Sequence, residues 1–265
     1  MNKEEVRSEF FVIIENYTQN LEEEFKNLWN TWDIKLSEKE KHQVIGGLIA
    51  RQISIGNHSL MCSTQWTNEM APIILRSMSD LYISLAWILK DPFLRSKKFI
   101  YYGLGRAKLE NEHRKAQLKN DGVNLEEDPL VQATESWINS QRFDFLTTVD
   151  VGSWSEISIR KMAEEADCLD FYNYVYQPFS SAAHSTWNHV GRHNVCKSTN
   201  PLHDYLLVPH IVKPEPNTVY IDIIAKYIEK CFHIFHKTFG TPRLIANSYL
   251  ALQNELDELY KTHSE

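Results

Sequence analysis

Residues 180–194, with the sequence SSAAHSTWNHVGRHN, bring three histidines, an arginine and a tryptophan into one short stretch. Histidine gains and loses a proton near neutral pH, which suits it to general acid–base catalysis. Ser181 and His184 lie three residues apart, so we expect them on one face at the start of a helix, with the hydroxyl bonded to the imidazole. The other interpretation is a core histidine bonded to a backbone carbonyl. No acidic residue follows within one turn, so a Ser-His-Asp triad would need a carboxylate from another helix, such as Asp80.

His189 and His193 are the other two histidines of this stretch, and they share a helical face because they are four residues apart. Such a pair can bind zinc, but a catalytic zinc site generally has a third protein ligand. A metalloprotease motif would also place glutamate directly after the first histidine, where this chain has Val190. We therefore treat His189 and His193 as weak metal candidates on a polar helical face, and we predict neither a metal nor a cofactor.

Arg76 and Asp80 form a second candidate site within the apolar sequence IILRSMSDLY. Their spacing of four residues predicts an ion pair across one helical turn. A charged pair in an apolar helix is either buried and mutually satisfied or directed into a polar pocket. If His184 meets the pair in the fold, the arginine would stabilise negative charge while the histidine transfers protons. Otherwise the pair braces neighbouring helices.

The elements that must position these residues are helices. Apolar residues recur at three- and four-residue steps, glycine and proline are few, and no alternating strand pattern occurs. We predict an all-α fold, a single-domain multi-helix bundle made of residues 1–265. Residues 1–36 would form an N-terminal helix, residues 37–198 the core, and residues 199–265 a proline-rich connection with the C-terminal helices.

Capping and packing signals predict how individual helices begin and where they lie. Ser37 and Glu40 resemble a capping box at the start of the second helix. Gly46 and Gly47 inside that helix predict close packing against a neighbour, because mid-helix glycine is otherwise unfavourable. The helix of residues 71–92 is apolar nearly all round and should be central.

The second half of the chain carries more proline. An aromatic helix after residue 168 should break near Pro178. Residues 200–217, NPLHDYLLVPHIVKPEPN, form a long connection with four prolines, which we expect to pack across the bundle. One or two helices should complete the chain, with an interruption at Gly240.

Composition limits the classes of function. The net charge of −7 argues against a broad basic surface for duplex nucleic acid, although it leaves room for a local pocket that handles one phosphate. The four cysteines are far apart and form no CxxC pair, as expected of reduced thiols. The N-terminus lacks the apolar run of a signal peptide, and no apolar segment is long enough for a membrane span. We therefore expect a cytoplasmic protein without membrane contact.

Two stretches, ILRSMSDLYISLAWILKDPFLRSKKFIYYG and WSEISIRKMAEEADCLDFYNYVYQPFSSAAHST, resemble a mainly bacterial helical family, the domain of unknown function 5677. The resemblance covers residues 40–195. The family more often has glutamate where this chain has Asp80, a difference of one methylene in the reach of the side chain. The positions that match the family pattern are Arg76, Asp80, Trp154, Tyr176, Ser181 and His184.

Helical bundles of this size also resemble HEPN proteins, many of which are metal-independent ribonucleases of toxin or antiviral systems. Their motif is an arginine followed, after four to six residues, by a histidine. RQISIGNH and RAKLENEH both have this spacing, which chance alone would produce about once in this chain. RAKLENEH is typical of a solvated helix face. Arg51 and His58 of RQISIGNH lie beside glycines in an apolar helix and are therefore the alternative catalytic pair.

The likeness to HEPN proteins implies a metal-independent, ribonuclease-like effector directed at RNA in a bacterial defence or toxin system. Its partners would be RNA or another protein of the same system, and we also expect a homo-oligomer. The alternative is a non-enzymatic helical interaction or regulatory module in which Arg76, Asp80 and His184 are structural. A small-molecule sensor would need a pocket near the aromatic run of residues 171–179. The catalytic set of the first hypothesis is Arg76, Asp80, Ser181 and His184.

Overall fold

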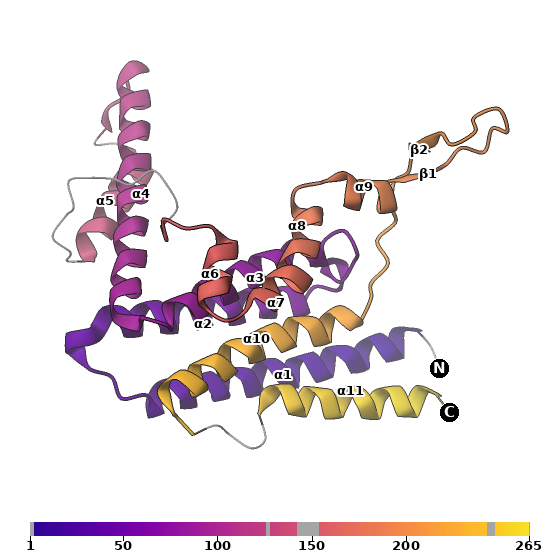
Figure 1. The fold of residues 1–265 in the computed structure, drawn as a ribbon, viewed down its shortest axis with the longest axis horizontal. Helices are drawn as coiled ribbons and strands as arrows, with labels where there is room; N and C mark the ends of the chain where they lie inside the picture. The colour runs from indigo at the N-terminus through magenta and orange to yellow at the C-terminus, as the bar shows by residue number, and fades with distance from the viewer. Residues whose placement is uncertain (1–2, 126–127, 142–153, 243–246, 265) are drawn as a thin grey trace.

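A computed structural model shows the chain as a bundle of helices with one small β-hairpin (Figure 1). The structure describes residues 3–125, 128–141, 154–242 and 247–264. The predicted all-α fold is confirmed. The elements are α1 (Lys3–Thr31), α2 (Lys39–Leu60), α3 (Ala71–Ile88), α4 (Pro92–Asn120), α5 (Pro129–Ser140), α6 (Ile159–Glu165), α7 (Leu169–Phe171), α8 (Gln177–Ala183), α9 (Trp187–His193), β1 (Val195–Lys197), β2 (Leu207–Pro209), α10 (Val219–Phe239) and α11 (Ser248–Ser264).

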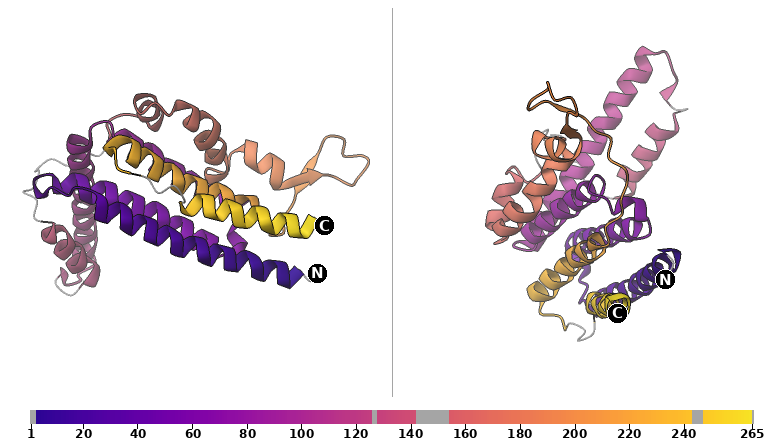
Figure 2. Two further views of the ribbon diagram at one scale, coloured as in Figure 1. Left: turned by 90° about the horizontal axis from the view of Figure 1, so that it is seen from below. Right: turned by 90° about the vertical axis from the view of Figure 1, so that its right-hand side faces the viewer.

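The core of the bundle surrounds α3, which packs against α2, α6, α8 and α10. Most residues of α3 are buried, so the prediction of a central helix is confirmed. α1 and α11 lie side by side, and both chain ends are at the same end of the bundle (Figures 1 and 2). One contiguous apolar core joins these helices and includes Tyr17, Ile45, Met78, Phe232 and Leu252.

α4 leaves the bundle at an angle, and α5 packs along it (Figure 1). Only three residues of α4 are buried, so most of this helix is in contact with solvent or with α5. Within the described part of the chain, no helix combines the length and the apolar character needed to cross a membrane.

The two glycines of α2 differ in their surroundings. A Cβ atom at Gly46 would lie 2.5 Å from the ring of Trp29, so glycine is what allows α1 and α2 to approach this closely. The predicted close packing is confirmed there. At Gly47 no atom of the described residues lies within 4 Å of a Cβ, so the same prediction is wrong for that position.

The start of α2 differs from the predicted capping box. Leu36–Glu38 form a 3-10 turn, α2 begins after it, and no side chain caps either element. The backbone N–H of Lys35 instead donates to Nε2 of His42 at 3.1 Å. The capping prediction for Ser37 is therefore wrong, because a histidine inside the helix, rather than the serine, bonds to the chain that enters it.

The aromatic segment before residue 180 is continuously helical and contains one π-helical turn. Tyr172–Tyr176 form a π-helical turn, and α8 follows directly with Pro178 in its first turn. Proline has no N–H to donate to the preceding turn, so the regular helical bonding pattern is disrupted around it. The chain remains helical from Leu169 to Ala183, so the predicted break near Pro178 is wrong, and a π-helical turn stands in its place.

Residues 195–209, which we call the arm, form an antiparallel hairpin in which Cys196 pairs with Val208. The sequence predicted no strand here, and it predicted that residues 200–217 pack across the bundle. The structure has two strands here, so the first prediction is wrong. The second is wrong for the arm, which projects beyond α9 instead of crossing the bundle (Figures 1 and 2). At its tip, Leu202 is 90% exposed and Tyr205 is 99% exposed. Strands of three residues are too short for an alternating pattern to identify them.

Candidate functional site

Arg76 is held by residues from two segments. Its guanidinium donates hydrogen bonds to the carboxylate of Asp80, one turn along α3, and to the phenol oxygen of Tyr176, just before α8. The guanidinium carbon also lies 3.5 Å from the centre of the Tyr176 ring, within the range of a cation–π contact. The Arg76 side chain is 13% exposed, and that of Asp80 is 41% exposed. The predicted ion pair is therefore confirmed, with Tyr176 as its third member.

The Tyr176 phenol remains protonated at neutral pH. Burial, followed by the charge of the neighbouring Asp80 carboxylate, raises the pKa of Tyr176 to about 12. The Nε atom of Arg76 is buried and has no hydrogen-bond partner among the described residues. The three side chains thus connect α3 to the segment that leads into α8, and only the carboxylate is substantially open to solvent.

Trp154, which matched the family pattern, lies at the other end of α3. Its ring makes edge-to-face contacts with Trp87 and Phe99, with ring centroids 5.3 Å and 4.9 Å apart. Beside it, the indole N–H of Trp87 donates to Glu165 at 2.7 Å, and the guanidinium of Arg95 stacks on the Trp87 ring. Trp154 is therefore part of an aromatic packing cluster that joins α3, α4 and α6.

Ser181 and His184 stand at the end of α8, not at the start of a helix as predicted. The helix ends here because Ser185 adopts a left-handed conformation with φ of 49°, which turns the chain into α9. His184 is exposed, and this excludes the buried core histidine that was the other interpretation. Within the described residues, the structure joins Arg76 to Asp80 but shows no hydrogen bond from either residue to Ser181 or His184.

Glu69, in the loop before α3, contacts the second pair of histidines. Its Oε2 lies 3.3 Å from Nε2 of His189 on α9, and its Oε1 accepts a hydrogen bond of 3.2 Å from the side-chain amide of Asn194. Because a carboxylate has no proton to donate, Nε2 carries the proton of the contact, and Nδ1 of the neutral imidazole is left as the acceptor. The ring of His193 lies 4.7 Å from that of His189, as the predicted shared helical face requires. A carboxylate therefore orients this imidazole, as in many acid–base catalysts.

Glu69 is not predictable as a site residue from the sequence, because 120 residues separate it from His189. No periodic pattern marks a single glutamate in the loop sequence TNEMAP. The one available signal was indirect, since the histidine stretch has no carboxylate of its own and any orienting acid had to come from elsewhere in the chain.

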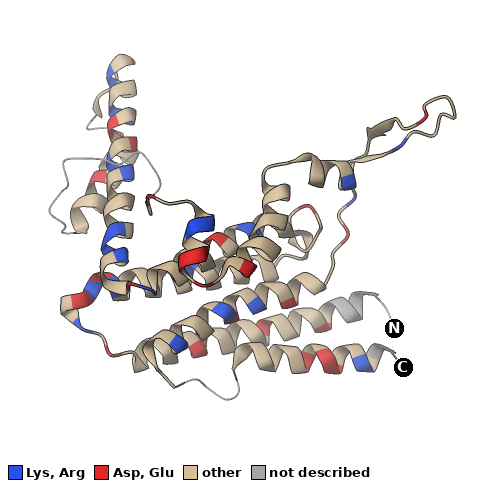
Figure 3. Cartoon of the chain, viewed as in Figure 1, with Lys and Arg blue, Asp and Glu red and all other residues tan. Residues whose placement is uncertain are grey.

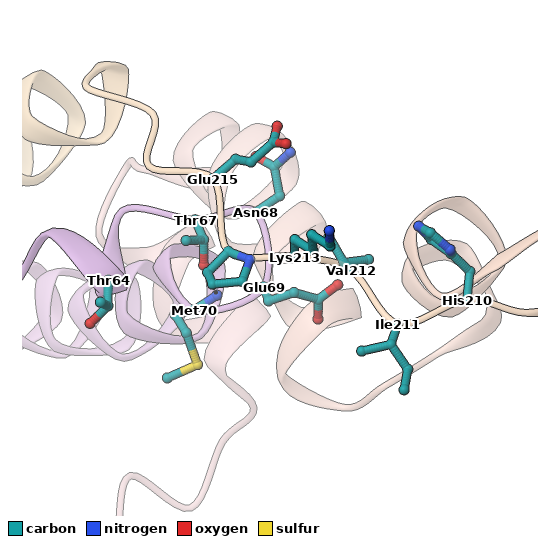
Figure 4. Close-up of a pocket in the computed structure, with 11 residues that line it drawn as sticks. Thr64, Thr67, Asn68, Glu69, Met70, His210, Ile211, Val212, Lys213 and Glu215 are labelled. Atoms are coloured by element: carbon teal, nitrogen blue, oxygen red, sulfur yellow. Dashed lines mark hydrogen bonds between the residues drawn. The ribbon is translucent and has the colours of Figure 1, made fainter. Parts of the chain in front are cut away.

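A pocket of about 540 Å³ opens beside Glu69 (Figure 4). Residues 64–70 form one wall, and residues 210–215, which we call the strap, form the other. The Glu69 side chain is 36% exposed and extends from its loop toward the strap (Figure 4). The pocket is therefore reached directly by the carboxylate that contacts His189.

The alternative pair, Arg51 and His58, lies on the exposed side of α2, two turns apart. Nδ1 of His58 is 2.7 Å from the carbonyl oxygen of Ser54, so Nδ1 carries a proton and Nε2 faces outward as an acceptor. Within the described residues, neither side chain forms a hydrogen bond or an ion pair with another helix. The two residues share a face, as their spacing of seven predicts, but the surface there is open.

The described residues contain no group of three histidine, cysteine, aspartate or glutamate side chains arranged to hold a metal ion. The rings of His189 and His193, the weak metal candidates, lie 4.7 Å apart and tilted by 38°, and His189 contacts Glu69.

A family model described as a family of unknown function, DUF5677, matches residues 42–201, which is more than half of the chain. The chain belongs to this family, and the resemblance predicted from the sequence is confirmed. The matched segment includes the Arg76 cluster, Glu69 and all the histidines of residues 180–194. No curated protein and no solved structure matches the chain.

Proposed function

We propose that this DUF5677 member is a cytoplasmic, RNA-directed effector of a bacterial defence or toxin system that cleaves RNA by acid–base catalysis without a metal. The contact between Glu69 and His189 carries the proposal. It supplies an imidazole in a fixed tautomer, next to a second imidazole and beside an open pocket. Acid–base chemistry at phosphate esters needs these groups, since one histidine removes a proton and another donates one.

The charge of the same region supports an anionic substrate. Residues 184–213 contain Arg192, Lys197 and Lys213 against the single acidic residue Asp204, a formal charge of +2 in a chain of −7. Five of the 11 histidines also lie in this segment. Elsewhere, acidic and basic residues are interspersed over the helices in the view of Figure 3. A local positive segment attracts one stretch of a phosphate backbone without a broad basic surface.

Cleavage would proceed through the ribose 2′-hydroxyl of the substrate. A neutral imidazole removes the 2′-hydroxyl proton while O2′ forms a bond to phosphorus. The bond between phosphorus and O5′ breaks, and a protonated imidazole donates a proton to O5′. The products are a 2′,3′-cyclic phosphate and a 5′-hydroxyl end, so the step requires neither water nor a metal. Nδ1 of His189 is the proposed base, and His184 or His193 the proposed acid.

Arg76 and Asp80 have a positioning role in this proposal. The guanidinium is 13% exposed and already bonded to Asp80 and Tyr176, which favours a junction between α3 and α8 over a direct phosphate contact. Through that junction Arg76 determines where α8, and the turn that carries His184, lie on the bundle.

RNA cleavage by the purified chain tests the proposal. Single-stranded RNA in the presence of EDTA should be cut, leaving 2′,3′-cyclic phosphate ends. Because proton transfer typically contributes about 100-fold or more, His189→Ala should lower the rate by that order, and so should one of His184→Ala and His193→Ala, whichever removes the acid. His113→Ala, which changes an exposed histidine on α4, is the matched control and should cleave normally. Intact RNA with the wild-type chain, or full activity in His189→Ala, would exclude this function.

A non-enzymatic interaction or regulatory module is the second candidate, and the cluster of Arg76, Asp80 and Tyr176 favours it. A paired, largely buried arginine is what a purely structural role requires. This candidate predicts that Arg76→Ala lowers the melting temperature while the wild-type chain leaves RNA intact.

A further inference from the structure

We infer that the pocket beside Glu69 binds one unpaired nucleobase of the RNA strand that carries an exocyclic amino group (adenine, cytosine or guanine), with uracil as the base that it disfavours. This inference rests on the proposed function, because it assigns the substrate feature that the same site would recognise. Sequence-specific recognition of RNA mostly uses bases that are out of the helix, since the edges of stacked and paired bases are covered.

The pocket has a built frame. The backbone N–H of His210, at the start of the strap, donates to the carbonyl oxygen of Asn194 at 2.8 Å. Just beyond its other end, the N–H of Asn217 donates to the carbonyl oxygen of Trp66 at 2.7 Å. These two bonds tie the strap to α9 and to the loop before α3, so the walls face each other at a set spacing. Its volume of about 540 Å³ lies in the range of pockets that hold small organic groups.

The polar groups at the pocket fit an amino-bearing base edge. Asn194 and His189 each bond to one oxygen of Glu69, and each oxygen keeps a further lone pair for a ligand. A carboxylate accepts hydrogen bonds from an exocyclic amino group such as that of cytosine. Asn68 is also oriented, because its Oδ1 accepts a hydrogen bond of 2.8 Å from the Tyr220 hydroxyl. Its amide N–H groups can therefore donate to a ring nitrogen or a carbonyl of the same base.

The remaining surface of the pocket suits a flat ring. Met70 on one wall and Ile211, Val212 and Pro214 on the other are apolar and provide the surface for packing on a base. Uracil fits this pocket less well, because it presents carbonyl oxygens where adenine and cytosine present an amino group, and two acceptors facing each other are unfavourable.

The charges place the phosphate outside the pocket. Two carboxylates, Glu69 and Glu215, and one cation, Lys213, line the pocket. Its interior therefore does not favour an anion. The cations Arg192 and Lys197 lie on α9 and the arm, in the segment that leads to the strap. A base in the pocket would thus keep its phosphates beside the positive segment and the histidines.

Binding of RNA that cannot be cleaved tests this inference separately from catalysis. The probes are 2′-O-methyl hexamers of adenylate, cytidylate and uridylate, measured by fluorescence anisotropy with the full chain. Because a good carboxylate–amine pair discriminates between bases, we expect the adenylate and cytidylate hexamers to bind about tenfold more tightly than the uridylate hexamer. Glu69→Gln should bring the three affinities within about twofold, whereas Glu258→Gln, an exposed glutamate on α11, should keep the difference.

A second variant keeps the test valid if Glu69→Gln unfolds the loop. Val212→Trp would fill the pocket from the strap. It should weaken the binding of the adenylate and cytidylate hexamers until their affinity equals that of the uridylate hexamer. Equal affinity of the wild-type chain for all three hexamers would overturn the inference. Cleavage without base preference would reject the pocket assignment and keep the proposed function. Base preference without cleavage would do the reverse.

Discussion

The carboxylate of Glu69 lies 3.3 Å from Nε2 of His189, although the two residues are 120 positions apart in the chain. The contact joins the loop before α3 to α9, and Asn194 completes it from the residue that follows α9. It also decides which imidazole nitrogen carries the proton, because the carboxylate can only accept. A histidine pair that was a surface feature in the sequence thereby becomes an oriented acid–base group.

The tautomer of His189 is a direct consequence of this contact. We expect the neutral imidazole to carry its proton on Nε2 in the wild-type chain, as nitrogen-15 NMR of the histidine rings would show. Glu69→Ala removes the acceptor and should give a mixture of both tautomers for His189 alone. Glu258→Ala serves as the control and should leave the spectrum unchanged. A wild-type ring protonated on Nδ1 would contradict the geometry.

Arg76→Ala should destabilise the fold. It leaves the Asp80 carboxylate and the Tyr176 phenol without their shared partner, and the cost should be about 2 kcal/mol because one partner is buried and the other partly solvated. Thermal unfolding should show a melting temperature about 6 °C lower. Arg106→Ala removes an exposed i,i+4 pair with Glu110 and should change stability by less than about 0.5 kcal/mol. A similar loss in both variants would argue against a special role for the Arg76 cluster.

Energetic coupling should distinguish Tyr176, which contacts Arg76 in the structure, from His184, which the catalytic hypothesis from the sequence places beside it. A double-mutant cycle with Arg76→Ala and Tyr176→Phe should give a coupling energy of about 1 kcal/mol, since the guanidinium donates to the phenol oxygen. The same cycle with Arg76→Ala and His184→Ala should give a value near zero in unfolding experiments, because no hydrogen bond joins these two residues. The opposite ranking would place His184 against Arg76.

Tyr176 should make stability fall at alkaline pH. Its pKa of about 12 in the folded chain lies above the ordinary value of 10.0, so the folded state binds the phenolic proton more tightly than the unfolded state. The contribution of the protonated Tyr176 phenol to the free energy of unfolding is complete below pH 10 and is lost as the pH rises toward 12. Urea unfolding at pH 9 and pH 11 should therefore show a smaller loss in Tyr176→Phe than in the wild-type chain. Tyr174→Phe, at a 78% exposed position, should behave like the wild type.

Gly46 and Gly47 offer a matched pair on adjacent positions of α2. Gly46→Ala would place a Cβ atom 2.5 Å from the Trp29 ring and should cost about 1–3 kcal/mol through overpacking. Gly47→Ala has free space and should stabilise the helix by about 0.5–1 kcal/mol, because alanine is the better helix former. Chemical denaturation of the two variants should move their midpoints in opposite directions.

The sequence by itself determined the helices and the contacts within one turn. Apolar residues at three- and four-residue steps predicted the bundle and the central position of α3. The four-residue spacings likewise predicted the pairs Arg76–Asp80 and His189–His193. These predictions hold because helical geometry relates sequence spacing directly to position in space.

Only the tertiary structure decided which segments meet. Tyr176 reaches Arg76 from 100 residues away, Glu69 reaches His189 from 120, and the arm leaves the bundle instead of crossing it. Such contacts depend on the crossing angles of packed helices and on single turns, such as the left-handed Ser185, and neither has a periodic signature in the chain. The sequence therefore identified the histidines and the Arg76–Asp80 pair, and the packing of the helices brought Glu69 and Tyr176 to them.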